Sequence, residues 1–274
     1  MDRRLIPANE RVAALHLKGK VEAEQYLKGA ARQVTASEAN LLRAPGGKRD
    51  RQLLMGERVT AYEDRAGYAF VQAARDGYVG YVDSLAIGPA QSMTHWIASR
   101  STHIYSTANF KSPETGTLSF GCEVCARSQA ENFVEIGDGQ FLPLQHLLEI
   151  GEGLQDMVSV AEMFLGTPYL WGGNSGTGID CSGLLQAACL ACGIPCPRDS
   201  DQQEAQLGKE LPKETPLERG DLVFWKGHVG LMLDGEILLH ANAHHMVVAV
   251  EPLTEAISRI SAKEFGDVTA VKRL

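Results

Sequence analysis

Between about residues 34 and 150, the sequence consists of short β-type runs interrupted by Gly, Asp and Asn. The runs 57–64 (ERVTAYED), 68–77 (YAFVQAARDG) and 78–87 (YVGYVDSLAI) are rich in valine and aromatic residues, as strands are. The chain contains 28 glycines, which permit many tight turns. This pattern predicts small β-domains and excludes a long-helix architecture for this region.

A weak internal repeat suggests that there are two such domains. The stretch 56–59 (GERV), followed by Phe70-Val71 and glycines at 77–80, has counterparts at 121–124 (GCEV), Phe133-Val134 and 137–139. Two small β-barrels, over 34–90 and 91–150, would account for this repetition. A single irregular β-sandwich is the alternative.

Helical spacing appears on both sides of this β-rich region. Residues 11–33 carry apolar side chains at helical intervals and predict an N-terminal helical segment over 1–33. After about residue 151, the sequence predicts one helix over 154–166, ended by Gly166, and a second from Asp180 to Cys192. Strand-like runs follow at 221–225, 228–233, 236–241 and 246–252. A helix pair ahead of an antiparallel sheet is an α+β arrangement, and we assign it to 151–274.

Charge and hydropathy narrow the classes of function. A net charge of −8 argues against non-specific nucleic-acid binding and against adhesion to an anionic membrane. No stretch approaches 18 uninterrupted apolar residues, and the first 20 residues lack the apolar core of a secretory signal. We therefore expect a cytoplasmic protein with no nucleic-acid or membrane partner.

Six cysteines are present, at positions 122, 125, 181, 189, 192 and 196. In a reducing compartment, disulfides are disfavoured. The CxxC at 122–125 and the cluster at 189–196 could together bind zinc. We favour the alternative that Cys189 and Cys192, in a run rich in alanine and leucine, are small buried core residues, and expect neither a metal nor a cofactor.

Cys181 is the exception among the cysteines, because Asp180 is a good helix N-cap and places Cys181 in the first helical turn. Unpaired backbone N–H groups and the helix dipole at that position favour a thiolate, the form that attacks a carbonyl. Cys181 is therefore a candidate nucleophile, and a buried structural cysteine is the alternative.

Two histidines on neighbouring strands are candidate partners of this cysteine. His228 begins one strand and His240 ends the next, with Asp234-Gly235 between them. A three-residue loop at 233–235, with Gly235 left-handed, would pair position 228 directly with 240 and put both rings on one face. We predict that His228 is the general base and that His240 orients it. His244 and His245 are expected to be exposed loop residues.

The order of several motifs resembles the NlpC-type family of papain-like cysteine peptidases, which cleave peptides of bacterial murein. The matching motifs span roughly 150–250 and are YLWGG (169–173), DCSG (180–183), PRDS (197–200), RGDLVFW (219–225), HVGLML (228–233) and LLHA (238–241). This resemblance implies a Cys–His–His triad of Cys181, His228 and His240. It also implies that Tyr169 lies beside the nucleophile, and that Trp171 and Ser182, within these motifs, lie at the substrate.

The β-region resembles bacterial SH3-like modules, a combination found in γ-D-glutamyl-L-diamino-acid endopeptidases that recycle free murein peptides with an N-terminal L-Ala. That branch implies a substrate pocket containing Asp199 and Ser200, completed by an acid and a tyrosine from the first module. We place these at Glu57 and Tyr81, with Tyr78 as a competitor for the tyrosine. Asp199 could equally cap the helix that follows it, and Glu57 could be an exposed hairpin acid.

The expected substrate is thus a small murein peptide whose free ammonium is bound by carboxylates. The sequence does not distinguish diaminopimelate from lysine in that peptide. Two other functions remain open: an amidase or acyltransferase using the same Cys–His pair, and a non-catalytic peptide-binding protein built on SH3-like modules.

Overall fold

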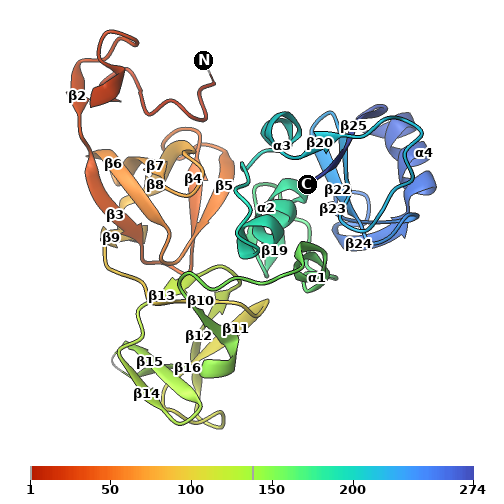
Figure 1. Ribbon diagram of the computed structural model, residues 1–274. Coiled ribbons are helices and arrows are strands. Elements are labelled where there is room, and N and C mark those ends of the chain that lie inside the picture. Colours follow the sequence, from red (N-terminus) through yellow and green to blue (C-terminus); the bar gives the residue numbers. More distant parts are fainter. Residues whose placement is uncertain (1, 138) are drawn as a thin grey trace. The chain divides into compact units, whose positions relative to one another are not determined.

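The computed structural model describes residues 2–137 and 139–274, and the chain divides into two compact units, 1–150 and 151–274 (Figure 1). The division coincides with the position where the sequence pattern changes from β-rich to mixed. The first unit contains two β-modules and an N-terminal segment. The second contains helices packed on one sheet.

The first β-module is a seven-stranded antiparallel sheet in the order β5-β4-β8-β7-β6-β3-β9. The β-type runs expected from the sequence correspond to β6, β7 and β8. The strands are β3 Ala30–Val34, β4 Glu38–Leu42, β5 Arg49–Leu54, β6 Arg58–Arg65, β7 Tyr68–Ala73, β8 Val79–Asp83 and β9 Ile87–Pro89. Because β3 begins at Ala30, the module starts a few residues before the expected boundary at 34.

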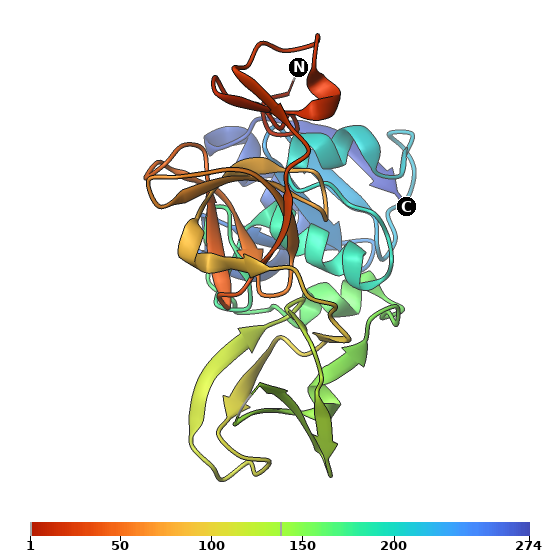
Figure 2. The same cartoon turned by 90° about the vertical axis from the view of Figure 1, so that its left-hand side faces the viewer.

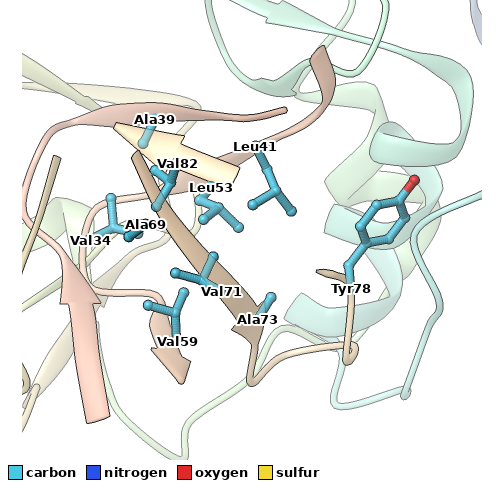
Figure 3. Packing of buried hydrophobic residues seen from close by; sticks show 10 residues of the cluster. All are labelled: Val34, Ala39, Leu41, Leu53, Val59, Ala69, Val71, Ala73, Tyr78 and Val82. Atoms are coloured by element: carbon cyan, nitrogen blue, oxygen red, sulfur yellow. The ribbon is translucent and has the colours of Figure 1, made fainter. Parts of the chain in front are cut away.

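Small and branched apolar side chains fill this module. Figure 3 shows the cluster, which consists of Val34, Ala39, Leu41, Leu53, Val59, Ala69, Val71, Ala73, Tyr78 and Val82. The alternation of buried and less buried positions along β4 is what a half-buried strand requires. In β7, Ala69, Phe70 and Val71 are all buried, because Phe70 packs with the N-terminal segment on the other side. Tyr78 differs from the other members, since its ring projects away from them (Figure 3).

The second β-module has its own core and its own sheets, one three-stranded and one five-stranded. Its strands are β10 His95–Ile97, β11 Ser101–Tyr105, β12 Glu114–Ser119, β13 Glu123–Val124, β14 Ser128–Ala130, β15 Phe133–Gly137, β16 Gln140–Pro143 and β17 Leu147–Glu149. Gly56 and Gly121, the matching glycines of the sequence repeat, both take positive φ, +86° and +79°. Two separate cores favour two modules over one sandwich.

The N-terminal segment is not helical, so the prediction of a helix over 1–33 is wrong. Its chain forms β1 (Val12–Ala14), a 3-10 turn η1 (Leu15–Leu17) and β2 (Gln25–Leu27), with β1 and β2 pairing in parallel. Three consecutive residues of β1 are buried and pack with Tyr62 and Phe70 of the first module. An extended chain can bury three residues in a row in this way, whereas one face of a helix cannot. Figures 1 and 2 show this segment and the second module at opposite ends of the first module.

The second unit is α+β, as expected. Its sheet has the order β20-β25-β21-β22-β23-β24 and is antiparallel throughout. The strands are β20 Lys209–Glu210, β21 Leu222–Trp225, β22 His228–Met232, β23 Ile237–Asn242, β24 Val247–Pro252 and β25 Val268–Arg273, with a small separate hairpin of β18 Asn174–Ser175 and β19 Gly178–Ile179. The helices are α1 Met157–Glu162, α2 Cys181–Ala191, α3 Ser200–Gln206 and α4 Leu253–Lys263.

The helices expected at 154–166 and 180–192 are present in shortened and nearly full form, respectively. Asp156 caps α1 by accepting a hydrogen bond from the Val158 N–H, and the chain turns at Gly166 with φ +79°. Gly193 follows α2 with φ +73°, the left-handed conformation of a helix C-cap. Among the described residues, no helix combines the length and the hydrophobicity needed to cross a membrane.

Candidate active site

The N-terminus of α2 is organised by the carboxylate of Asp180. One carboxylate oxygen accepts a hydrogen bond from the Gly183 N–H at 2.7 Å, and the other accepts from the Gly172 N–H at 2.8 Å. The same side chain therefore caps α2 and holds the preceding glycine loop. Cys181 is the first residue of this helix, in agreement with the N-cap expected from the sequence.

Two glycines allow the loop and the helix to approach closely. A Cβ atom on Gly183 would lie 2.5 Å from the carbonyl oxygen of Gly173, and one on Gly173 would lie 2.4 Å from that of Gly178. Real side chains do not tolerate such distances to backbone atoms. The glycines of YLWGG and DCSG are thus needed to place Cys181 where it is.

Arg198 holds this loop through hydrogen bonds, a role that was not predicted from the sequence. Its side chain is 1% exposed and donates to the Ser182 hydroxyl at 2.8 Å, the Gly173 carbonyl at 3.1 Å and the Asp180 carboxylate at 3.0 Å. Burial acts to lower the pKa of Arg198, but Asp180 outweighs it and raises the pKa above its usual value. Arg198 belongs to the PRDS motif at 197–200. This motif is the feature of the sequence that could have indicated its role.

Cys181 lies against β22, the strand that begins with His228. The backbone N–H of Val229, the residue after His228, hydrogen-bonds its sulfur. A small cavity between α2 and the sheet is lined by Cys181, Val229, Leu239 and His240, among others. The structure therefore brings the proposed nucleophile to the strands that carry both histidines.

The two histidines contact each other directly. His228 Nε2 and His240 Nδ1 are 2.8 Å apart, and both side chains are buried, 3% and 1% exposed. His228 also stacks on Phe265, with ring centroids 5.4 Å apart and planes inclined by 9°. The rings thus lie on one face of the sheet, as the sequence-based geometry required.

The register that produces this contact differs from the expected one. Met232 pairs with Leu238 and Leu231 with Leu239, so His240 is diagonal to His228 rather than directly opposite. The Leu233 N–H donates to the Ile237 carbonyl, which makes the loop 234–236 instead of 233–235. Asp234 closes that loop by accepting from the N–H groups of Glu236 and Ile237 at 2.7 and 2.8 Å, so no left-handed glycine at 235 is required.

Burial has the largest effect on the pKa values of Cys181 and His228. Burial, assisted by Asp180, raises the pKa of Cys181 to about 12, against the lowering effect of the Val229 and Ser182 N–H groups. Burial, followed by His240, lowers the pKa of His228 well below 6.5. Burial thus acts against the thiolate-favouring effect that was expected of the helix N-terminus, and it is the larger influence on the pKa of Cys181.

Beyond His240 lies a carboxylate that sequence reasoning missed. Glu251 Oε1 is 2.7 Å from His240 Nε2, and Arg259 from α4 forms an ion pair with the same carboxylate. Glu251 pairs with Leu238 in the β23–β24 ladder, which places it diagonal to His240 on the same face. Counting that ladder from the sequence would have revealed it.

These residues also include a possible set of metal ligands. Ligand atoms of His240, His245 and Glu251 lie within 4.8 Å of one another. Arg259 already provides the cation beside this carboxylate. His244 and His245 are exposed, as expected, and the His245 ring lies 3.0 Å from the Asn242 side-chain oxygen.

The other residues predicted in the second unit surround the helix N-terminus. Burial raises the pKa of Tyr169 above its usual value, and an electrostatic interaction with Cys181 acts in the same direction. Ser182 is buried under Arg198, whereas Trp171 is 66% exposed. Their roles toward a substrate remain predictions.

Asp199 and Ser200 lie where α3 begins. Asp199 occupies the N-cap position, yet its side chain makes no capping hydrogen bond. The helix therefore does not depend on this carboxylate in the way the alternative reading assumed. Ser200 is the first residue of α3 and is buried, 8% exposed. A substrate-binding role for both stays a prediction.

Glu57 and the two tyrosines lie in the first unit. Glu57 is 2% exposed and pairs with Arg51 at 2.9 Å, so it is not an exposed hairpin acid. Tyr81 is half-buried, packs on Phe70 and accepts a hydrogen bond from Asn9 at 3.0 Å. Tyr78 is buried, with Arg51 6.0 Å above its ring. Which of these contact a substrate remains a prediction.

Fold and site together define an α+β protein with a cysteine at a helix N-terminus and two hydrogen-bonded histidines on the adjoining sheet. Residues 166–265 match the NlpC/P60 family, and residues 41–87 match the bacterial dipeptidyl-peptidase SH3 domain. A probable endopeptidase of Haemophilus influenzae is 31% identical over 150 residues, covering 51% of this chain and 86% of that protein. The chain belongs to the NlpC/P60 family, and the resemblance noted from its motifs is confirmed.

Two further similarities cover different shares of the chain. A γ-D-glutamyl-L-lysine dipeptidyl-peptidase of Bacillus subtilis is 40% identical over 111 residues, which is 38% of this chain and 37% of that relative's own length. The crystal structure of an NlpC/P60 family protein from Bacillus cereus superposes with a TM-score of 0.73 at 19% identity, covering 89% of this chain and 99% of the other. The latter supports the fold over both units.

Proposed function

We propose that this chain is a cysteine endopeptidase that hydrolyses the γ-D-glutamyl–diamino-acid amide bond of free murein peptides bearing an N-terminal L-Ala. The observation that supports the proposal is that Cys181, at the start of α2, lies against β22, and that this strand begins with a buried His228 whose ring is hydrogen-bonded to His240. The similarity to a γ-D-glutamyl-L-lysine dipeptidyl-peptidase supports the bond type.

The proposed reaction uses Cys181 as the nucleophile and His228 as the general base. His228 takes the thiol proton as the sulfur attacks the γ-carbonyl carbon of D-Glu, giving a tetrahedral oxyanion. In this proposal, the Tyr169 hydroxyl and the N–H groups at the start of α2 stabilise that oxyanion. The C–N bond then breaks, and His228 gives its proton to the leaving amine of the diamino acid.

The second half of the reaction regenerates the thiol. The product of the first half is a thioester between Cys181 and L-Ala-D-Glu. His228 removes a proton from water as its oxygen attacks the thioester carbonyl, and the C–S bond breaks to release the dipeptide acid. The proton returns to the sulfur. No external oxidant, reductant or cofactor enters this sequence.

Asp199 is our candidate for binding the substrate's α-ammonium, because it carries the half-buried carboxylate of the PRDS motif at the start of α3. A buried or half-buried carboxylate discriminates strongly against an acylated amine, which offers it no charge. Acetylating the N-terminus of the substrate should therefore lower kcat/KM by roughly 100-fold.

A panel of peptides tests the proposal. L-Ala-γ-D-Glu-L-Lys, the corresponding diaminopimelate peptide and their tetrapeptide forms, each free and N-acetylated, are incubated with the protein and the products are identified by mass. The proposal predicts L-Ala-D-Glu as the acyl product from the free peptides. Cleavage of another bond, or joined products, would indicate the amidase or acyltransferase instead, and no product at all would favour the binding protein.

Asp199→Asn refines the same experiment. Its KM should rise for the free peptide and stay unchanged for the acetylated one, because only the former presents a cation. Asp201→Asn, on the exposed side of α3, is the matched control and should affect neither substrate. Equal effects of Asp199→Asn on both substrates would remove Asp199 from the ammonium site.

A further inference from the structure

Three side chains beyond the cysteine form a continuous hydrogen-bonded series. His228 Nε2 contacts His240 Nδ1 at 2.8 Å, and His240 Nε2 contacts Glu251 Oε1 at 2.7 Å. Arg259 ion-pairs with the same carboxylate and also with Glu264. The His240 side chain has no exposed surface, so water does not provide its ring nitrogens with alternative partners.

The series has a direction that follows from the chemistry of its last member. Arg259 forms an ion pair with Glu251, and a positively charged guanidinium beside a carboxylate favours its ionised form. An ionised carboxylate only accepts hydrogen bonds, so His240 Nε2 must carry a proton. A neutral imidazole carries one proton, which leaves His240 Nδ1 as an acceptor. His228 Nε2 must then donate, and His228 Nδ1 is left with its lone pair.

We propose that Glu251, held by Arg259, is a positioning residue that sets the tautomers of His240 and His228 and leaves His228 Nδ1 unprotonated, the form that the proposed general base requires. This inference rests on the proposed function, since it concerns how the same site is prepared. It extends the triad by a carboxylate on β24 and an arginine on α4. Neither residue lies in the motifs that revealed the triad.

Other charged and titratable groups around this series do not replace the carboxylate. His245, in the turn between β23 and β24, lies close enough to Glu251 to share a ligand cluster, but its Nδ1 is engaged with Asn242. Glu264 contacts Arg259 through a different guanidinium nitrogen. On the α2 side, Asp180 is paired with Arg198. Glu251 is the carboxylate within hydrogen-bond distance of His240 in the described part of the chain.

Glu251→Gln tests the proposal because it preserves size and polarity. A glutamine amide can donate to His240 Nε2, which reverses the series and places a proton on His228 Nδ1. We expect kcat to fall by roughly 100-fold with KM changed less than about twofold, as for loss of the correct tautomer. Arg259→Gln should give a smaller fall. Glu255→Gln, an exposed acid at the start of α4, is the matched control and should leave kcat unchanged.

A second readout does not depend on turnover. Long-range ¹H–¹⁵N spectra of histidine-labelled protein should show His228 and His240 both protonated at Nε2 in the wild type, and protonated at Nδ1 in a substantial fraction of Glu251→Gln molecules. A purely structural role for Glu251 would leave both tautomers unchanged. Wild-type spectra with His240 protonated at Nδ1, or an unchanged kcat in Glu251→Gln, would overturn the proposal.

Failure of this inference is distinguishable from failure of the proposed function. If Cys181→Ala is inactive and Glu251→Gln is fully active, the peptidase assignment stands and the positioning role falls. If Cys181→Ala retains full activity, the peptidase mechanism itself falls, whereas the spectra still report on the tautomers.

Discussion

Arg198 lies 3.0 Å from the carboxylate of Asp180, and both side chains are buried at the start of α2. Removing one partner of a buried ion pair leaves the other charge without compensation. Arg198→Met should therefore lower the free energy of unfolding of the second unit by about 3–5 kcal/mol. Urea denaturation, followed by the fluorescence of the buried Trp225, measures this change.

Arg219 offers the control for that prediction. Its ion pairs with Asp156 and Glu162 are exposed, with 42% of the Arg219 side chain accessible. Arg219→Met should cost no more than about 1 kcal/mol. Equal losses for the two variants would contradict the role assigned to the buried pair.

Gly183→Ala should destabilise the protein although alanine is the better helix former. In an open helix interior, this change would gain up to about 1 kcal/mol. Here the new Cβ would lie 2.5 Å from the Gly173 carbonyl oxygen, so the loop or the helix must move. We expect a lower melting temperature and, because Cys181 shifts with the helix, reduced peptide hydrolysis. A melting temperature at or above the wild-type value would refute the close-approach argument.

Stability should fall as the pH drops below about 6.5. Burial lowers the pKa of both His228 and His240 in the folded protein, so between 6.5 and those lower values the unfolded chain binds more protons. In this range, each histidine lowers the free energy of unfolding by up to about 1.4 kcal/mol for each unit by which the pH falls. His228→Gln should flatten the dependence of the unfolding free energy on pH between 7 and 5. His103→Gln, at an exposed position, should not.

Glu57→Gln should loosen the first β-module. The Glu57 carboxylate is buried and forms an ion pair with Arg51, which also pairs with Asp76. In the variant, the Asp76 carboxylate alone would compensate the buried charge of Arg51 only in part. Hydrogen exchange should accelerate in β5 and β6 while the second module keeps its protection. Unchanged exchange accompanied by a raised KM for peptides with a free amine would instead support the substrate role expected from the motif.

The positions of the candidate residues could be predicted from the sequence better than the N-terminal segment. Short motifs predicted Cys181 at a helix start and His228 and His240 on neighbouring strands with both rings on one face, and the structure shows these positions. The helix over 1–33 failed because apolar spacing alone does not distinguish an amphipathic helix from an extended chain that covers a barrel. Val12 to Ala14 are all buried, which no single helix face provides.

Details that depend on tertiary packing were beyond the motifs. The loop between β22 and β23 lies at 234–236, one residue later than expected, because the Asp234 side chain stabilises the turn there. Glu251 and Arg259 come from later elements, and their contact with His240 follows from ladder pairing and from the packing of α4. The raised pKa of Cys181 reflects burial, which the helix-terminus argument did not include.

Replacing the nucleophile tests the account most directly. Cys181→Ala is assayed beside Cys189→Ala, which removes a fully buried thiol from the same helix, by measuring release of L-Ala-D-Glu from L-Ala-γ-D-Glu-L-Lys. The account predicts no detectable release by Cys181→Ala and near-normal release by Cys189→Ala. Dipeptide release by Cys181→Ala at the wild-type rate would contradict it.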